Sequence, residues 1–491
     1  MRYTAYLRQR YRAIIGYTGL ICLIAGLGIL APLIALIAYP EEMAIAWGLL
    51  LPGGLLCLLG GLMWRLAPKS TVSLTLQEGA VVVVLGWLLA VVFGAAPFIL
   101  LDGLTLTQAV FEATSGWTTT GLSVVDVTQT SRLILLYRST IELIGGAGLA
   151  IITLSAITGP AGSGLSTAEG RSEQLAPNVQ RSAKLVLGIY SGYVAVGIVA
   201  LWLAGMGWFD AVNHSFAALS TGGFSTRPDS IGYWDSPAVE AVTLVLMILG
   251  GLNFVTGYLL LTGKFAAVLR NGQVRLQALV IPLCALILLF GVMPLVYPEP
   301  GKAIRVALFE TITALSTTGF STVGYTDWNS LGWIVMIGLM LIGGGAGSTA
   351  GGIKQLRIYI LYRSLLWEVR RMMLPQQAVS EPHIWQSEQR RFLNDEQIRQ
   401  VGVFVFLYLV TYLIGSTIIA AYGYSLQESL FEYASTMGTV GLSVGVTAAD
   451  APPGLLWTQI VGMFLGRLEF FTVFVGVIRL LKDVRPAILS S

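Results

Sequence analysis

Four short segments of the chain combine glycine with small hydroxyl-bearing residues, and they align on one glycine without gaps. Every copy has threonine two places before that glycine, then leucine or phenylalanine after it, then serine. The copies recur about every 100 residues, which indicates four copies of one structural unit. They read FEATSGWTTTGLS (111–123), NHSFAALSTGGFS (213–225), FETITALSTTGFS (309–321) and FEYASTMGTVGLS (431–443).

Backbone carbonyl oxygens are the groups with which these segments could do chemistry. Glycine adopts left-handed dihedral angles that β-branched residues resist, so a Thr-Thr-Gly string can alternate conformation and point successive carbonyls one way. Non-helical backbone survives at membrane depth only where protein buries it or where it lines a water-filled path. Four such segments around one axis would form rings of carbonyl oxygens, which can replace the hydration shell of a cation. The residues before each segment suit a short helix, whose negative C-terminal end would face that ion.

The composition is that of a membrane protein. Hydrophobic residues make up 55% of the 491 residues and charged residues 11%, whereas a soluble domain carries about 25% charged residues. Apolar runs of roughly 20 residues, long enough to cross a bilayer, recur along the whole length. We expect ten spans, at roughly 13–39, 43–64, 79–101, 131–157, 185–206, 237–262, 277–297, 331–360, 400–422 and 454–481.

The basic residues predict the orientation of these spans. An even number of spans puts both termini on one side of the membrane. Most of the 29 lysine and arginine residues fall in the N-terminal arm, after the even-numbered spans and at the C-terminus. Because basic residues collect on the cytoplasmic side of membrane proteins, we expect cytoplasmic termini. All four glycine segments then lie on the opposite side, each between two spans.

Four helix–loop–helix units with a Thr-Thr-Gly-like loop in each resemble the Trk/Ktr/HKT superfamily of potassium transporters. The two extra spans before the first unit are similar to the Trk branch of that superfamily, and the resemblance covers nearly the whole chain. It implies an all-α polytopic membrane protein with four pseudo-symmetric helix–pore loop–helix repeats around one pore, preceded by two extra transmembrane helices. The implied domains are a two-helix N-terminal domain (1–70) and pore repeats at 71–165, 166–270, 271–375 and 376–491.

The resemblance implies a selectivity filter of backbone carbonyls for K⁺, the transported ion. In the family, glycine at the filter position of all four repeats goes with potassium permeation, while serine in the first repeat goes with sodium preference in some plant members. Gly222 and Val440 replace the second threonine of the motif, so the four walls are not equivalent. The implied filter residues are Thr119, Thr120, Gly121, Leu122, Thr221, Gly222, Gly223, Phe224, Thr317, Thr318, Gly319, Phe320, Thr439, Val440, Gly441 and Leu442.

Three of the segments carry a glutamate nine places before the shared glycine, and the second copy has histidine there. We expect these side chains to hydrogen-bond the loop backbone and to add negative potential, with direct ligation of the ion as the alternative. The four residues are Glu112, His214, Glu310 and Glu432.

The spans after the four segments also align, and one of them carries an arginine. The position after a shared glycine holds glycine in three copies and Arg467 in the fourth. An arginine near the middle of a span costs about 2.5–3.5 kcal/mol on insertion scales, so it faces protein or water rather than lipid. In the family, the arginine at this place projects into the permeation path. Arg467 is then a barrier to cations, or alternatively an anchor paired with Glu469 or another buried acid.

The third of these spans contains the string GGGAGSTAGGIKQLR (343–357), which is a poor helix because each interior glycine costs roughly 1 kcal/mol relative to alanine. A break here would leave a flexible loop inside the membrane, and the family has an intramembrane gating loop at this place. The alternative is tight packing of a small-residue helix. The expected gate comprises Arg467, Gly343, Gly344, Gly345, Gly347, Ser348, Gly351, Gly352 and Lys354.

The resemblance also implies partners. In the family a cytosolic ring of nucleotide-binding subunits gates a membrane homodimer. We therefore expect a homodimer and a TrkA-like RCK ring, docked on the long polar connection 363–400, unless that connection is merely solvated. The glycine string lacks the lysine and strand context of a phosphate-binding loop, so we expect no nucleotide site on this chain, and no nucleic-acid partner.

The expected function is potassium uptake across the bacterial cytoplasmic (inner) membrane, without enzymatic activity. The alternative is a sodium- or proton-coupled secondary cation symporter, which would have two matched halves and buried acids along its path. An intramembrane hydrolase using Ser348 and His214 is excluded, because these residues come from opposite halves of the membrane and a catalytic pair must be in hydrogen-bond reach.

Overall fold

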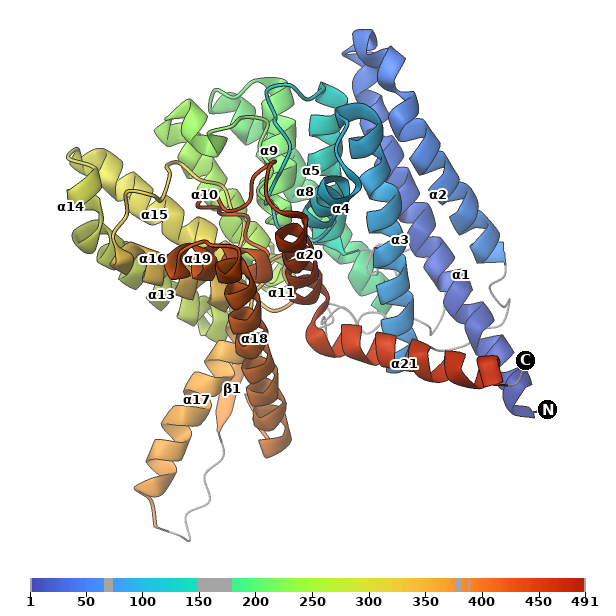
Figure 1. The fold of residues 1–491 in the computed structure, drawn as a ribbon. Coiled ribbons are helices and arrows are strands. Elements are labelled where there is room, and N and C mark those ends of the chain that lie inside the picture. The colour runs from blue at the N-terminus through green and yellow to red at the C-terminus, as the bar shows by residue number, and fades with distance from the viewer. Residues whose placement is uncertain (1, 66–73, 149–178, 376–381, 387–388, 490–491) are drawn as a thin grey trace.

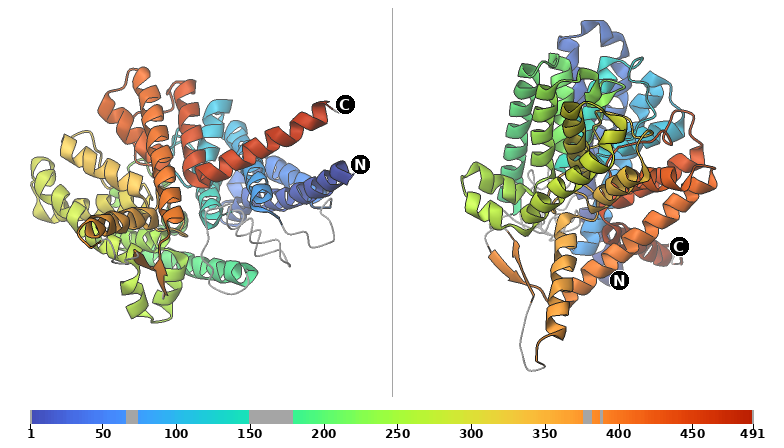
Figure 2. Two further views of the ribbon diagram at one scale, coloured as in Figure 1. Left: turned by 90° about the horizontal axis from the view of Figure 1, so that it is seen from below. Right: turned by 90° about the vertical axis from the view of Figure 1, so that its left-hand side faces the viewer.

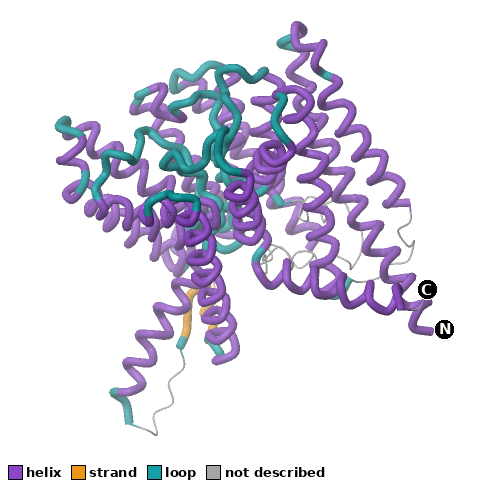
Figure 3. Tube along the Cα trace, viewed as in Figure 1, coloured by secondary structure: helices purple, strands orange, loops and turns teal. Residues whose placement is uncertain are grey.

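The computed structural model describes residues 2–65, 74–148, 179–375, 382–386 and 389–489, and almost all of them are helical or in loops between helices (Figures 1 and 3). α1 (Arg2–Leu30) and α2 (Trp47–Arg65) pack side by side, joined by the short 3-10 helices η1 (Ala31–Ile37) and η2 (Pro40–Ile45). Gly19 and Gly60 face each other where the two helices cross, since an added Cβ on either would lie 2.6 Å from the other's carbonyl oxygen. Small residues allow this close approach of two helices.

Along the rest of the chain, eight helices alternate with the four helices that precede the glycine loops, which we call the short helices. The eight helices are α3 (Leu76–Asp102), α5 (Arg132–Ala147), α8 (Val179–Leu203), α10 (Pro237–Gly251), α13 (Gly272–Gly291), α16 (Ser330–Ile342), α18 (Asp395–Ala421) and α20 (Pro453–Leu468). The short helices are α4 (Leu106–Trp117), α9 (Trp208–Ser220), α15 (Pro300–Ser316) and α19 (Leu426–Gly438). The remaining helices are α11 (Phe254–Leu261), α12 (Phe265–Arg270), η3 (Ser230–Trp234), α14 (Met293–Val296), α17 (Gln355–Met372) and α21 (Phe470–Leu489).

Local sequence explains where several of these helices begin. α3, α4 and α19 each start with a capping box, in which a threonine or serine side chain accepts from the third helical N–H and a glutamate or glutamine returns a bond to the cap. This arrangement satisfies two N–H groups that would otherwise lack partners. The start of α5 is held differently, because both carboxylate oxygens of Glu42 accept from the N–H groups of Arg132 and Leu133 at 2.9 and 2.8 Å.

The described residues contain six helices long and apolar enough to cross a membrane, or up to eight if each of two bent pairs counts as one span. α16 is a shorter apolar helix, and α5 ends next to residues outside the described part. The number ten therefore stays a prediction. The predicted domain boundaries at 70 and 165, and the end of the predicted span 131–157, also lie outside the described residues. The six helices are Arg10–Ile37, Trp47–Arg65, Leu76–Asp102, Arg181–Leu203, Gly272–Val296 and Asp395–Ala421.

Two predicted spans are not continuous helices. The span predicted at 237–262 turns by 118° between α10 and α11, and the span at 454–481 turns by 104° between α20 and α21. At the first bend the Asn253 side chain accepts from the Val255 N–H at 2.7 Å and so starts a new helix. At the second bend Glu469 has a left-handed backbone with φ of 61°. Neither bend was predicted from the sequence.

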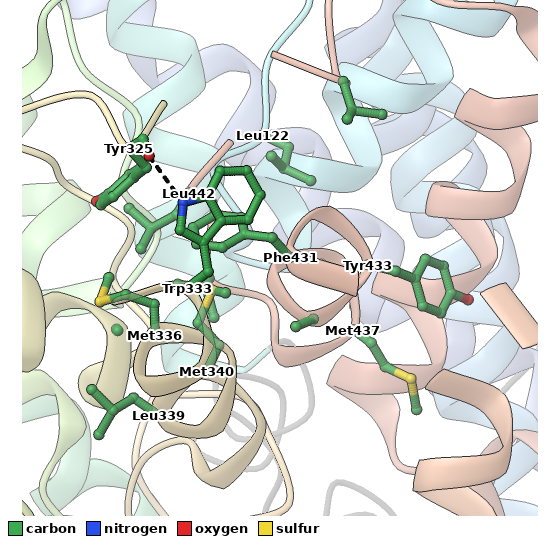
Figure 4. Packing of buried hydrophobic residues seen from close by; sticks show 14 of the residues in the cluster. Leu122, Tyr325, Trp333, Met336, Leu339, Met340, Phe431, Tyr433, Met437 and Leu442 are labelled. Carbon is green, nitrogen blue, oxygen red and sulfur yellow. Dashed lines mark hydrogen bonds between the residues drawn. The ribbon is translucent and has the colours of Figure 1, made fainter. Parts of the chain in front are cut away.

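The buried apolar residues form separate clusters around the short helices. One cluster joins α15, α16, α18, α19 and α20, and it contains Phe431, Trp333 and Met437 (Figure 4). The Trp333 indole N–H donates to the Tyr325 carbonyl at 3.1 Å, which satisfies its polar atom inside the cluster. Leu122, from the loop after α4, belongs to the same cluster, so the first and last parts of the chain meet there.

One part of the described chain departs from the all-helical prediction. β1 (His383–Gln386) and β2 (Gln389–Phe392) pair antiparallel, with His383 opposite Phe392. Figures 1 and 2 show this hairpin beside α17, away from the main helical body. The hairpin belongs to the polar connection that the sequence predicts to be a docking surface.

Candidate functional site

Three of the four short helices end directly before the threonine that the repeats share, and α4 ends two places before it. This threonine has a left-handed backbone in every copy, with φ between 50° and 56°, and the glycine two places later has φ between 80° and 98°. The N–H between them donates to the carbonyl five places back, at 2.8 to 3.0 Å in all four loops. A left-handed residue with a side chain costs about 1–2 kcal/mol, and sequence reasoning gave this conformation to the glycines only. The threonines are Thr119, Thr221, Thr317 and Thr439, and the glycines are Gly121, Gly223, Gly319 and Gly441.

The four loops meet in a closed ring of contacts. Each glycine lies so close to the next loop that an added Cβ would overlap the carbonyl oxygen just before that loop's own glycine. The contacts run from the first loop to the second, the third, the fourth and back to the first. Segments some hundreds of residues apart are thereby held together through their backbones. The glycine–carbonyl pairs are Gly121–Gly222, Gly223–Thr318, Gly319–Val440 and Gly441–Thr120.

The residue after each glycine buries its side chain in protein. Leu122 and Leu442 belong to one hydrophobic cluster (Figure 4) and Phe320 to another. The Phe224 ring lies 4.0 Å from the guanidinium carbon of Arg138. None of these four apolar side chains is more than 3% exposed. These side chains anchor the loops in the surrounding helices. The contacts between the loops of the ring are made by backbone atoms.

Buried carboxylates fix three of the loops just beyond the ring. Each carboxylate accepts a hydrogen bond from the N–H twelve places later, at 2.9 to 3.1 Å, and also accepts from at least one hydroxyl. Full burial of a carboxylate is costly unless hydrogen bonds replace its water, and these bonds do so. The prediction that these residues bond the loop backbone is confirmed. The pairs are Glu112 with Val124, Glu310 with Thr322, and Glu432 with Val444.

The second loop is held by several side chains. His214 donates from Nδ1 to the Asp210 carbonyl at 2.8 Å, so its Nε2 accepts from the Ser225 hydroxyl at 3.0 Å. The carboxylate that α9 lacks at the shared position comes from Glu142 of α5, whose Oε1 accepts from the Phe224 N–H at 3.0 Å. Asp210 of α9 also binds this loop, because it accepts from the Thr226 hydroxyl at 2.6 Å. Sequence reasoning missed Glu142.

Glu142 also explains why glycine replaces the second threonine in this copy. A Cβ on Gly222 would lie 2.6 Å from Glu142 Oε1, which leaves no room for a side chain. Among the described residues, Glu142 Oε2 is buried without a hydrogen-bond partner. The sequence held one signal of this arrangement, because Gly222 and His214 are two departures from the motif within one copy.

Arg138 of α5 ties the first loop to the second. Its Nε donates to Glu112 at 2.9 Å and its Nη2 to the Ser123 hydroxyl at 2.8 Å. Its Nη1 donates to the Ser225 carbonyl at 3.2 Å. The side chain is only 3% exposed, and removing one partner of such a buried pair costs about 3–5 kcal/mol.

Outside the ring, hydrogen bonds from Thr128 lower the pKa of Asp126 and keep this loop residue charged.

Residues 343–354 separate α16 from α17 and are not helical. Gly343, Gly347 and Gly352 have left-handed φ of 71°, 73° and 77°, which a helix cannot contain. The predicted break is therefore present, and the alternative of a packed small-residue helix is wrong. The segment is also not loose, since the Gly345 N–H donates to the Gly251 carbonyl at 2.9 Å and the Thr349 hydroxyl to the Gly250 carbonyl at 2.9 Å.

The glycine-rich segment lies against three of the four loop threonines. The Thr221 hydroxyl donates to the Thr349 hydroxyl at 3.1 Å, and the Gly351 N–H donates to the Thr317 hydroxyl at 2.8 Å. A Cβ on Gly351 would overlap the Thr439 hydroxyl. Thr349 was not among the predicted gate residues, although it is the segment's contact with the second loop.

Three other predicted gate residues of this segment bond within it or to the first residue of α17. The Gly344 carbonyl accepts from the Gln355 N–H at 2.9 Å, and the Lys354 ammonium donates to the Ala350 carbonyl. The Ser348 hydroxyl donates to the Gly345 carbonyl at 2.6 Å. Ser348 and His214 thus have different partners, in agreement with the exclusion of a hydrolytic pair.

Arg467 reaches from the fourth repeat to the first. Its Nη2 donates to the Gly145 carbonyl at 2.6 Å, and its guanidinium carbon is 5.9 Å from the Trp87 ring. Glu469 pairs with Arg357 instead, at 2.8 Å. The alternative that anchors Arg467 on Glu469 is therefore wrong.

The fit between Gly222 and Glu142 yields a test of this geometry. We expect Gly222→Ala to destabilise the protein by about 1–3 kcal/mol, as overpacking does in a full core. Glu142→Ala removes the obstacle, so the double variant should be less destabilised than the sum of the single changes, by at least about 0.5 kcal/mol. Thermal unfolding of the detergent-solubilised protein measures all three.

Gly324→Ala is the matched control, because an added Cβ there meets no atom within 4 Å. It should leave the unfolding temperature unchanged. Additive effects of the two single changes would contradict the close contact between Gly222 and Glu142.

Known proteins resemble this chain along almost its whole length. The TrkH family, described as a cation transport protein, matches residues 52–483. An uncharacterised cation transporter of Methanocaldococcus jannaschii is 31% identical over 97% of this chain and 98% of its own length. The Trk system potassium uptake protein TrkH of Escherichia coli K12 is 31% identical over 95% of this chain and 98% of its own.

A solved structure has the same fold. The crystal structure of the potassium transporter TrkH from Vibrio parahaemolyticus superposes with a TM-score of 0.82 at 29% identity, covering 95% of this chain and 98% of that one. The family is one of transporters rather than enzymes, and the apolar helices are those of a multi-pass membrane protein. The chain belongs to the TrkH family of cation transport proteins.

Proposed function

We propose that this protein takes up potassium through the ring formed by the four glycine loops. The observation that carries the proposal is the cyclic contact, in which each loop glycine lies against the carbonyl just before the next loop's glycine. Converging carbonyl dipoles are the ligands that stand in for the water shell of an alkali cation. Each short helix points its C-terminal end at the same place, and the partial negative charge there adds to the attraction.

Potassium is the proposed ion for two reasons. Relatives that match 95% or so of this chain bear the name potassium uptake protein, TrkH in Escherichia coli and in Vibrio parahaemolyticus. All four loops also have glycine at the shared position, so no side chain projects from it. The proposed ion ligands are carbonyl oxygens of the predicted filter residues, and the buried glutamates act by fixing the backbone.

The glycine-rich segment and Arg467 are the proposed gate. The segment contacts Thr221 and Thr317 at the end of the ring that faces the short helices. A cation that leaves the ring on this side meets either that segment or the positive charge of Arg467. We propose that both must shift for conduction.

Several further features belong to the proposal, and they rest on the sequence pattern and on the family. They are ten spans, pore repeats at 71–165, 166–270, 271–375 and 376–491, and an N-terminal domain at 1–70. They also include cytoplasmic termini in the inner membrane, a homodimer, and a cytosolic nucleotide-binding subunit that docks near the β1–β2 hairpin and α17.

Rubidium uptake by proteoliposomes tests the central proposal. We expect uptake driven by a potassium or rubidium gradient alone, because a carbonyl ring needs no second substrate. Uptake that strictly requires a sodium or proton gradient would favour the coupled symporter and would contradict the channel-like mechanism. Protein-free vesicles give the background.

Gly319→Ser tests the ring itself. A Cβ at this position overlaps the Val440 carbonyl, so the fourth loop must move and the carbonyl spacing changes. We expect the ratio of rubidium to sodium flux to fall by at least about fivefold, which corresponds to about 1 kcal/mol. Gly324→Ser lies five places away with open space around it and should keep the ratio of the unmodified protein. Unchanged selectivity in Gly319→Ser would exclude this glycine from the filter.

Arg467→Ala tests the barrier. A unit charge about 8 Å from a passing cation raises its energy by about 2 kcal/mol at an effective dielectric of about 20. We therefore expect rubidium flux to rise by roughly thirtyfold. Lys482→Ala, a change of an exposed cation on α21, should leave flux unchanged. If flux is the same with and without Arg467, its only role is structural, through its hydrogen bond to the Gly145 carbonyl.

A further inference from the structure

A cavity of about 510 Å³ lies between α17, the β1–β2 hairpin, α18 and the start of α21. Its lining residues come from other parts of the sequence than the loop ring, and they include both polar and apolar side chains. One part carries the guanidinium groups of Arg357 and Arg391 and the amides of Gln397 and Gln400. Gln397 Oε1 is buried and has no hydrogen-bond partner among the described residues.

The other part of the wall is apolar. Ile384, Val401, Phe404 and Phe471 line it, from the hairpin, α18 and α21. Along α18 the polar and apolar residues follow one another on a single face, since positions 397, 400, 401 and 404 have helical spacing. A hydrated anion would gain nothing from contact with the apolar residues. An apolar molecule would leave the two guanidinium groups without an anionic partner. The walls match an amphiphile with an anionic head.

The cavity lies beside the beginning of a candidate membrane span. α18 is a candidate span that begins at Asp395, so Gln397 is in its first turn and Phe404 is deeper in its apolar part. α21 turns by 104° from α20 and therefore runs close to perpendicular to a helix of the bundle (Figure 1). Its exposed Phe471 and Phe474 and its charged Lys482 are typical of a helix that lies in the interface.

Arg357 can bind a further anion without losing its present contacts. It pairs with Glu469 at 2.8 Å, and its guanidinium carbon lies 3.8 Å from the Phe404 ring. Arginine has five N–H donors in a planar fork that suits phosphate. We propose that this cavity binds one anionic phospholipid, with its phosphate between Arg357 and Arg391 and an acyl chain along Phe404 and Phe471.

Occupancy would act on both proposed gate elements. Arg357 is in the first turn of α17, directly after the glycine-rich segment, and its partner Glu469 is two places after Arg467. A phosphate beside Arg357 shares the guanidinium with Glu469 and thereby weakens their ion pair. This consequence for flux rests on the proposed function, whereas binding of the lipid does not.

Native mass spectrometry of the full chain in mild detergent tests the binding. The probes are phosphatidylglycerol, which is anionic, and phosphatidylcholine, which has no net charge. We expect the protein to retain phosphatidylglycerol in preference to phosphatidylcholine. Arg391→Gln should weaken this retention about tenfold, the loss expected for one charge-assisted hydrogen bond. Val401→Trp should weaken it similarly by filling the cavity.

Arg399→Gln is the matched control, because Arg399 is an exposed cation on α18 that does not line the cavity. It should retain the lipid like the unmodified protein. Arg391→Gln changes an exposed side chain, so it keeps the test decisive if Val401→Trp fails to fold. Equal retention of the two lipids, or full retention in Arg391→Gln, overturns the proposal.

Two other outcomes also overturn it. Displacement of phosphatidylglycerol by millimolar inorganic phosphate alone would assign the polar wall to a free anion. A change in the fraction of dimer in Val401→Trp with unchanged lipid retention would assign the cavity to a contact between two copies of the chain. Rubidium flux of the same variants in proteoliposomes separates the proposals, since a variant that loses the lipid but still conducts leaves the proposed function intact.

Discussion

The contact between a glycine Cα and a carbonyl of the next loop governs the arrangement of this protein. Because the contact recurs four times and closes on itself, no loop can be displaced without a change in its neighbours. Any side chain at these glycines would overlap a backbone atom, and backbone cannot move aside as a flexible side chain can. The composition of the loops follows from this constraint. Small residues lie where the loops meet, and large apolar residues such as Phe320 and Leu442 come directly after them and anchor each loop in its own cluster.

The ring is also surrounded by buried charged side chains, and their arrangement does not have fourfold symmetry. Three loops take a carboxylate from their own short helix. The second takes a histidine and Asp210 from its own helix, and the carboxylate at its Phe224 N–H, Glu142, comes from α5. A buried carboxylate needs several donors to offset its lost hydration, and loop N–H groups supply them. The same bonds that make burial of the acid tolerable therefore hold the loop in its left-handed conformation, against a cost of about 1–2 kcal/mol for each threonine.

Sequence reasoning gave the parts of the structure that depend on local pattern. The four loops, their shared register and the break at residues 343–354 all follow from glycine and threonine spacing. What it missed depends on contacts between distant residues. Glu142 acts on a loop some eighty residues later, and nothing in its own neighbourhood marks it. The bends at Asn253 and Glu469 were hidden because apolar composition continues through both. Thr349 was omitted from the gate because its partners, the Leu219 carbonyl and Thr221, lie on another repeat.

The glycine-rich segment has a composition that favours flexibility, but hydrogen bonds hold it in one position. Its glycines allow left-handed angles and close approach, yet its backbone and Thr349 donate to Gly250, Gly251 and Thr317. A displacement breaks these bonds together, and each buried donor left without a partner costs about 1–3 kcal/mol. A second position therefore has to offer replacement partners, from water or from protein. The exit of the segment into α17 carries Arg357, and its ion pair with Glu469 joins the segment to the bend that follows Arg467. A movement of the segment that shifts α17 would act on this bend through the Arg357–Glu469 ion pair. We therefore expect the two proposed gate elements, the glycine-rich segment and Arg467, to move together.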